Sequence, residues 1–266
     1  SYFKRVSFDI TPDDIFAIPS DERVQNFKDS QSDPHLVELM FQYGRYLLIS
    51  SSRPGSLPAN LQGVWTNKIQ TPWNGDYHTD VNVQMNYWLA EVTNLSDIHL
   101  PLFDLVESLV EPGRKTARIQ YHLDGWVIHP ITNIWGYTAP GERASWGMHA
   151  GGGAWICSHI GEHYAFTGDK DFLKRMYPVL KGSVEFYIGW LVENPERKNE
   201  FIIEIPEIRV NENIQIIVKS NEPPNGNYFE DSKGIYLGNF YANETGITSI
   251  LNTPAAVNYK KEYLNL

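Results

Sequence analysis

The sequence predicts a mainly α-helical domain followed by a segment of different character. Apolar residues recur at helical spacing between residues 33 and 195, in segments separated by polar or glycine-rich loops, and strand signals there are few. Apolar and polar residues alternate in residues 200–220 (EFIIEIPEIRVNENIQIIVKS), and many of their side chains are β-branched. Both features indicate strands. We therefore expect a lead-in or linker at 1–31, a helical catalytic-domain portion at 32–196 and a divergent tail at 197–266.

The first predicted helix begins at Asp33-Pro34. Aspartate is a favoured N-cap, and proline is favoured at the first helical position. The apolar residues that then keep helical spacing are Leu36, Met40, Tyr43 and Leu47. The serine-rich segment SSSRPG ends this helix.

A second helix is predicted to begin near Val81. Its apolar side consists of Val81, Met85, Trp88 or Leu89, and Val92. Asn82 and Asn86 lie four residues apart on another face. The start of this helix can therefore present His78, Asp80 and Asn82 to a common cleft.

A third helix is predicted over residues 100–121, and Pro112-Gly113 is expected to bend or split it. Its apolar side consists of Leu102, Leu105, Val106 and Leu109. Residues 123–149 have no regular period, and a loop of this length inside a compact domain is usually functional. We interpret it as a second wall of the cleft, in which Trp135 and Trp146 either stack on a ligand or plug the core beneath the loop.

Two more helices are predicted after the glycines at 151–153, which we interpret as a point of close helix packing. One covers 154–166, and the other runs from Asp171 to about Val192, where Pro178 should kink or divide it. The first contains HIGEH at 159–163, which fits the H-x-x-E-H metal pattern, because histidines four residues apart could both reach one zinc ion. The alternative is a hydrogen-bonded structural pair of histidines, since no third ligand stands out in the sequence.

Composition excludes some classes of partner. The chain of 266 residues has a formal charge of −10, whereas nucleic acids and anionic membrane surfaces attract basic patches. No apolar run approaches the roughly 20 residues of a membrane helix. Cys157 is the single cysteine, so an internal disulfide is excluded. We therefore predict neither nucleic acid nor membrane as a partner.

Residues 54–94 combine aromatic rings with side-chain amides and carboxylates. The rings are those of Trp65, Trp73, Tyr77, Tyr87 and Trp88. A sugar lays its C–H faces on such rings and offers its hydroxyls to the polar groups, and buried amides left without a partner would cost about 1–3 kcal/mol each. The stretch predicts an oligosaccharide or glycan as the substrate. The competing interpretation is a solvent-exposed loop whose aromatic rings belong to the core.

This stretch also resembles glycoside hydrolase family 95, the inverting α-L-fucosidases and relatives acting on α-linked L-sugars. The similarity lies in LPANLQGVW, PWNGDYH and HTDVNVQMNYW, and it extends from about residue 21 to about residue 195. It implies an (α/α)6 toroid of the six-hairpin glycosidase type, here incomplete. It also implies no cofactor, no metal in the site, and a secreted, periplasmic or cell-surface location.

The resemblance assigns roles to several residues. Asn82 matches the asparagine that holds the attacking water together with a distal aspartate, and His78 matches a sugar-binding histidine. We expect Trp73 and Asn74, in the PWNGDYH motif, to contact substrate as well. Glu212, in Glu212-Asn213, is the candidate general acid, although the Ser/Thr-Pro residues that precede it in the family are missing here.

Asp80 departs from the family pattern, because many relatives carry asparagine two residues before Asn82. A carboxylate here could act as a base itself or bind a sugar hydroxyl, so the substrate could carry L-fucose or another L-sugar such as L-galactose. No counterpart of the distal aspartate stands out in the tail. We therefore expect this chain alone to have low or no activity.

Three functions are consistent with these patterns. The first is hydrolysis of terminal α-L-fucosyl or α-L-galactosyl residues from glycans by an inverting mechanism, in which the acid and the base lie about 6.5–9.5 Å apart. The second is a catalytically inactive carbohydrate-binding remnant of the same family. The third is a zinc peptidase built on HIGEH.

Overall fold

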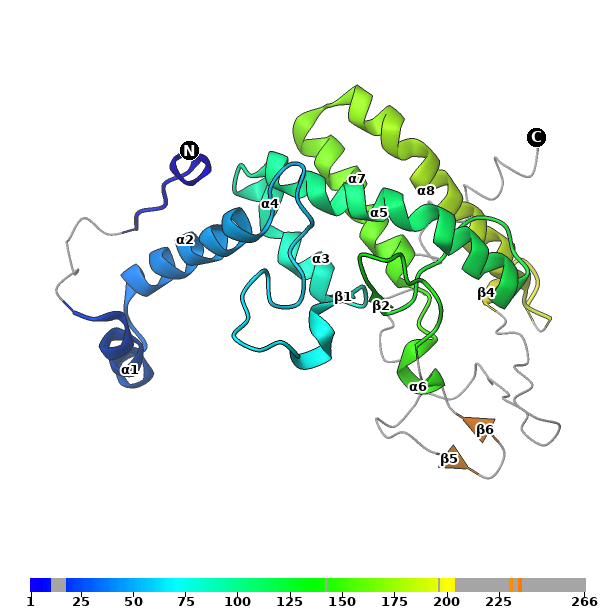
Figure 1. Ribbon diagram of the computed structural model, residues 1–266, viewed down its shortest axis with the longest axis horizontal. Helices are drawn as coiled ribbons and strands as arrows, with labels where there is room; N and C mark the ends of the chain where they lie inside the picture. The colour runs from blue at the N-terminus through cyan, green and yellow to red at the C-terminus, as the bar shows by residue number, and fades with distance from the viewer. Residues whose placement is uncertain (11–17, 142, 196, 204–229, 232–233, 236–266) are drawn as a thin grey trace.

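The computed structural model describes residues 1–10, 18–141, 143–195, 197–203, 230–231 and 234–235, and within them the chain is mainly helical, as predicted (Figure 1). The helices are η1 Tyr2–Arg5, α1 Ser20–Ser30, α2 Pro34–Ser51, η2 Pro72–Gly75, α3 Asn82–Tyr87, α4 Leu89–Val92, α5 Ser96–Thr116, η3 Ala117–Tyr121, α6 Ala144–Gly147, α7 Gly152–Thr167 and α8 Lys170–Trp190. The strands are β1 Tyr77–His78, β2 Ile131–Thr132, β3 Leu191–Glu193, β4 Phe201–Ile203, β5 Glu230–Asp231 and β6 Gly234–Ile235. The helices described here form an elongated arrangement and do not close a ring by themselves (Figure 1). None of them is long and apolar enough to cross a membrane.

Helix α2 begins where the sequence predicts, because the Asp33 side chain accepts a hydrogen bond from the Leu36 backbone N–H at 3.2 Å. Its predicted apolar side is largely left in solvent, however, with Met40 70% and Tyr43 56% exposed. The residues that α2 buries are His35, Arg45, Leu48, Ile49 and Ser51. The helix was therefore predicted correctly, but its apolar side does not join the core of the described residues.

Arg45 is fully buried and attaches the start of the chain to α2. Its guanidinium donates hydrogen bonds to the backbone carbonyls of Tyr2, Phe3 and Val6, at 3.1–3.2 Å, and to the Gln42 side chain at 2.8 Å. Burial lowers the pKa of Arg45. Carbonyl oxygens thus replace the water that a guanidinium would otherwise bind.

The predicted helix around residues 81–92 forms as two short helices, α3 and α4, and its predicted apolar side was wrong. Met85, Trp88 and Val92 are 47%, 49% and 64% exposed. The buried side consists of Val83, Gln84, Tyr87, Ala90 and Glu91. Polar atoms on this buried side find partners: Gln84 donates to the Thr79 carbonyl at 2.7 Å, and the Tyr87 hydroxyl donates to Ser52 Oγ at 2.8 Å. Because these polar residues make hydrogen bonds inside, apolar periodicity alone pointed to the opposite face, although Gln84 Oε1 has no hydrogen-bond partner among the described residues.

Helix α5 supplies the centre of the core, and its predicted apolar residues are buried. It begins at Ser96, passes Pro112 without being split, and continues into the π-helical turn η3. Helices α7 and α8 pack against it, and they form a helical hairpin whose turn is Gly168-Asp169 (Figure 1). Gly168 has a φ of +63°, and the Asp169 carboxylate caps α8 by accepting the N–H groups of Asp171 and Phe172, both at 2.9 Å.

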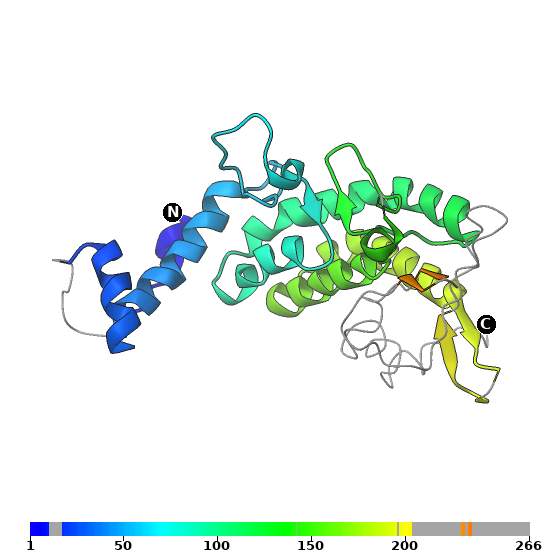
Figure 2. The ribbon, with the colours of Figure 1, turned by 90° about the horizontal axis from the view of Figure 1, so that it is seen from below.

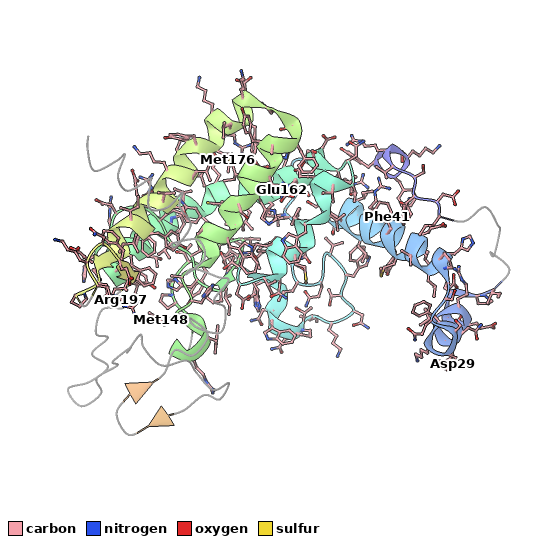
Figure 3. The ribbon with its side chains drawn as sticks, turned by 180° about the vertical axis from the view of Figure 1, so that it is seen from behind. Asp29, Phe41, Met148, Glu162, Met176 and Arg197 are labelled. Atoms are coloured by element: carbon pink, nitrogen blue, oxygen red, sulfur yellow. The ribbon has the colours of Figure 1, made fainter. Side chains whose placement is uncertain are left out.

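Helix α8 is also continuous, so Pro178 does not divide it. Its Met176 is fully buried on the side that faces α5 and α7 (Figure 3). Trp126, from the long loop, is fully buried too, and its indole N–H donates to the Val179 carbonyl at 2.8 Å. Trp126 is therefore the loop tryptophan that plugs the core.

After α8 the chain turns to strands. Strand β3 pairs antiparallel with β4, with Val192 opposite Ile202. The strand expectation is thus confirmed for residues 201–203. Residues 204–229, which carry the rest of the alternating segment, lie outside the described residues.

Candidate functional site

The centre of the candidate site is the antiparallel pair of β1 and β2, where Tyr77 is opposite Thr132 and His78 is opposite Ile131. This pair joins the predicted cleft stretch to the long loop that the sequence predicted as its second wall. Thr79 extends the contact, since its backbone N–H donates to the Pro130 carbonyl and its hydroxyl to the His129 carbonyl, both at 2.8 Å. The two walls are therefore connected by backbone hydrogen bonds.

The glycine-rich start of α7 packs directly on Thr79. A Cβ added at Gly152 would collide with Thr79 Oγ1 and would lie 2.8 Å from the Thr79 carbonyl oxygen. Only a glycine lets the two backbones approach this closely. The prediction that residues 151–153 serve close packing is confirmed at this contact.

His78, Asp80 and Asn82 lie between β1 and the first residue of α3. Asp80 is exposed and Asn82 is half-buried. The His78 Nε2 atom lies 3.0 Å from Asp76 Oδ1, but the pair is not aligned as a hydrogen bond, so neither buried atom has a hydrogen-bond partner among the described residues. Buried polar atoms of this kind are suited to bind the hydroxyls of a ligand.

His149 is a residue that the sequence analysis did not single out. It lies next to Met148, where α6 leads into α7 (Figure 3), and it is half-buried. Burial lowers the pKa of His149, and the charge of Asp80 acts on it in the opposite direction. In the sequence, His149 is marked only by its position three residues before Gly152. In the structure, Gly152 packs on Thr79.

His129 lies behind the site and is neutral. Burial lowers the pKa of His129 to about 4. The ring is held by the Thr138 carbonyl at 2.7 Å and by the Tyr121 hydroxyl at 2.6 Å. It therefore supports the β1–β2 pair as a fixed, uncharged group.

The predicted tryptophans have different environments. Trp73 and Trp135 are 70% and 86% exposed, whereas Trp146 is half-buried and its ring covers Gly141. Asn74 is exposed beside Trp73. Of the other rings in the stretch, Tyr77 and Tyr87 belong to the core. The core interpretation is thus correct for the tyrosines, while Trp73 and Trp135 remain available to a ligand.

The two histidines of HIGEH take part in a buried network that was not visible in the sequence. Glu91 Oε1 accepts hydrogen bonds from His163 Nδ1 at 2.6 Å and from His99 Nδ1 at 2.7 Å. His99 Nε2 lies 3.0 Å from His159 Nδ1, and Ser96 donates to the other Glu91 oxygen at 2.6 Å. Both histidines are therefore hydrogen-bonded, as the structural interpretation predicts, with Glu91 and His99 as their partners.

Glu91, His99 and His163 are also the described residues best placed to hold a metal ion, with ligand atoms within 4.8 Å of one another. Burial by itself would raise the pKa of Glu91, but the hydrogen bonds from His163, His99 and Ser96 outweigh it and lower that pKa. Burial lowers the pKa of His99, and it lowers the pKa of His159 to about 3. The Glu91 carboxylate thus has three hydrogen-bond donors of its own within the cluster. Glu162, the acid of the motif, is next to His163 on α7 but is not part of this cluster (Figure 3).

Comparison with known proteins identifies the family. Residues 1–219 match the glycosyl hydrolase family 95 catalytic domain. The chain belongs to glycosyl hydrolase family 95. The predicted family resemblance is confirmed, and the match extends beyond its expected bounds, about residues 21–195, at both ends.

Two curated relatives are similar over about two thirds or more of this chain. Alpha-L-fucosidase 2 of Arabidopsis thaliana is 50% identical over 177 residues, which are 66% of this chain and 21% of the relative. Probable alpha-fucosidase A of Aspergillus niger is 37% identical over 191 residues, which are 71% of this chain and 24% of the relative. The chain thus spans about a fifth to a quarter of the length of these curated relatives. Glu212 falls within the family match but outside the described residues.

Proposed function

We propose that the protein hydrolyses terminal α-L-fucosyl or α-L-galactosyl residues of glycans with inversion, as part of an (α/α)6 toroid. The observation that carries the proposal is the segment from His78 to Asn82, fixed by Thr79 against both β2 and α7, inside a family 95 match. Thr79 is fully buried while Asp80 faces solvent, so the segment combines a rigid backbone with accessible polar groups. Such preorganisation favours binding of a sugar and its attacking water.

Each polar group has a distinct role in this proposal. The Asn82 amide orients the water, and His78 with Asp76 binds hydroxyls of the sugar in the −1 position. Asp80 either accepts the proton of that water or binds a hydroxyl, and its charge acts on the nearby His149 ring. Glu212 is the proposed general acid, which must stay protonated near neutral pH in order to protonate the leaving oxygen.

The first experiment measures hydrolysis of 2'-fucosyllactose by residues 1–266. We expect low or no turnover, because no counterpart of the distal aspartate stands out in residues 197–266. Calorimetric binding of L-fucose is expected nevertheless, and Asn82→Ala should weaken it. Rapid turnover that Asn82→Ala abolishes would contradict the expected inactivity, and failure of the protein to bind L-fucose would contradict the sugar site itself.

The second experiment distinguishes the two sugars. L-galactose differs from L-fucose by a hydroxyl on C6, which the Asp80 carboxylate could accept. If Asp80 binds this hydroxyl, wild type prefers L-galactose, and Asp80→Asn reduces that preference by about tenfold, the usual effect of one hydrogen bond to a charged group. An unchanged preference would instead favour Asp80 as the base.

Binding without hydrolysis is the second candidate function. The exposed Trp73 and Trp135 favour it, because they can contact a sugar without acting on its glycosidic bond. Stoichiometric L-fucose binding with no product after prolonged incubation would support it.

A further inference from the structure

Two tryptophans on separate loops are held in solvent. Trp135 is 86% exposed and Trp73 is 70% exposed, although an indole is among the largest apolar surfaces that a protein can bury. Exposed aromatic residues on a fixed backbone are typical of ligand-binding surfaces.

The loop that carries Trp135 is shaped by its own hydrogen bonds. Asn133 Oδ1 accepts the backbone N–H groups of Trp135 at 3.0 Å and of Tyr137 at 3.3 Å. Gly136 has a φ of +77°, and the Tyr137 hydroxyl donates to the Pro140 carbonyl at 2.7 Å. This asparagine-centred turn fixes the backbone at Trp135 while leaving its side chain free of the core.

The turn that carries Trp73 is equally well defined. Trp73 and Asn74 have φ values of +47° and +55°, a left-handed conformation that costs a non-glycine residue of order 1–3 kcal/mol. Gln62 Nε2 donates to the Pro72 carbonyl at 3.1 Å, and the Asp76 N–H donates to the Trp73 carbonyl at 3.3 Å. These contacts hold the turn in a conformation that an unsupported chain would avoid.

Both tryptophans leave the same end of the β1–β2 pair. Because Tyr77 is opposite Thr132, the chain before β1 and the chain after β2 lie at one end of the pair. Trp73 is four residues before Tyr77, and Trp135 is three residues after Thr132. Figure 2 shows the two loops rising on the same side of the molecule. Asp80 and Asn82 follow β1 and therefore lie toward the opposite end.

We propose that Trp73 and Trp135 bind the sugars beyond the terminal residue, so that the ligand is an extended oligosaccharide. The inference rests on the proposed function, which places the terminal L-sugar between His78 and Asn82. The tryptophans lie at the other end of the β1–β2 pair from Asp80 and Asn82, so a ligand that contacts both groups must extend along the pair. The indoles offer flat apolar faces to the C–H faces of these sugars, and the exposed Asn74 amide offers hydrogen bonds to their hydroxyls.

Calorimetry on residues 1–266 tests this inference with three probes: L-fucose, lactose and 2'-fucosyllactose. Wild type should bind the trisaccharide more tightly than L-fucose. Trp135→Ala should weaken trisaccharide binding by about tenfold, the order expected for one aromatic contact, and should change L-fucose binding by less than about twofold. Trp73→Ala should act in the same direction, and Trp135→Phe should retain most of the affinity. Ile134→Ala is the matched control, because Ile134 is 50% exposed on the same loop but has no ring.

The outcomes separate this inference from the proposed function. If L-fucose binds but Trp135→Ala leaves trisaccharide binding unchanged, or weakens both sugars equally, the aromatic surface is disproved and the function stands. If lactose binds as tightly as 2'-fucosyllactose and Trp135→Ala weakens both, the aromatic surface is supported and the L-sugar specificity fails. If no probe binds to wild type, both proposals are wrong.

Discussion

At the scale of the residue, Glu91 carries the network that joins α4, α5 and α7. Its side chain is only 1% exposed and accepts hydrogen bonds from His99, His163 and Ser96. A carboxylate in such a position is stable only while its donors remain. The network therefore makes the packing of three helices depend on one charge.

Glu91→Gln keeps the shape of the side chain but removes the charge and places an NH2 group where an acceptor is needed. We expect the free energy of unfolding to fall by about 3 kcal/mol. Urea denaturation followed by circular dichroism measures it. Glu185→Gln is the control, since Glu185 and its partner Lys181 are about half exposed, and it should change stability by less than about 0.5 kcal/mol. Equal effects of the two substitutions would show that the network contributes little.

Acid should destabilise the protein through the same residues. The fold lowers the pKa values of His99 and His159, that of His159 to about 3. These rings therefore stay neutral in the folded protein, whereas histidines of the unfolded chain gain protons below about pH 6.5. Stability should therefore be greatest above that pH and fall as the pH drops. The lowered pKa of Glu91 adds a second loss below about pH 4.3, where the unfolded carboxylate is protonated. Urea midpoints between pH 8 and pH 4 test this, and a midpoint that is constant or rises toward acid would contradict it.

Individual site residues differed in how far the sequence could predict them. His78, Asp80 and Asn82 are local in sequence, so their motif was sufficient to propose them as candidates. His149 comes near Asp80 only because Gly152 packs on Thr79, and the Glu91 network assembles from three helices. Contacts of that kind depend on tertiary packing, which periodicity does not encode.

At the scale of the element, α7 depends on how closely its first turn approaches Thr79. Gly152→Ala should destabilise the protein by about 1–3 kcal/mol and also weaken sugar binding, because the added methyl group must displace the Thr79 backbone. Gly161→Ala, on the same helix with open space around its Cβ position, should stabilise by about 0.5–1 kcal/mol. Thermal unfolding and L-fucose calorimetry measure both variants. Similar behaviour of the two would indicate that the Thr79 contact can relax.

The helices themselves were predictable where local capping signals mark their ends. Asp33 caps α2 as expected, and the Gly168-Asp169 turn before α8 is a local signal of the same kind. The error on α3 and α4 arose because Gln84 and Glu91 are buried with hydrogen-bond partners that lie outside these helices. An amphipathic pattern records polarity, whereas burial also depends on whether a partner is available.

At the scale of the whole molecule, α2 presents an apolar surface to solvent. Its members are Val37, Leu39, Met40, Tyr43 and Tyr46, between 43% and 70% exposed. A contiguous apolar surface of this kind usually marks an interface.

This surface should bind a hydrophobic dye. We expect residues 1–266 to enhance the fluorescence of 8-anilinonaphthalene-1-sulfonate, and the double variant Met40→Lys/Tyr43→Lys to lose most of that enhancement while keeping its helical content. Ile69→Lys is the control, because Ile69 is fully exposed and is not part of the α2 surface. Equal dye binding by the double variant and wild type would mean that the dye binds elsewhere.

The attachment of residues 2–6 to Arg45 bears on how this polypeptide can be trimmed. A shortened version that starts at α1 would lose the three backbone carbonyls that accept hydrogen bonds from the buried Arg45 guanidinium. Water would then reach Arg45 on α2. Anyone engineering a smaller scaffold from this molecule should therefore either retain the first six residues or replace Arg45 with methionine in the same step.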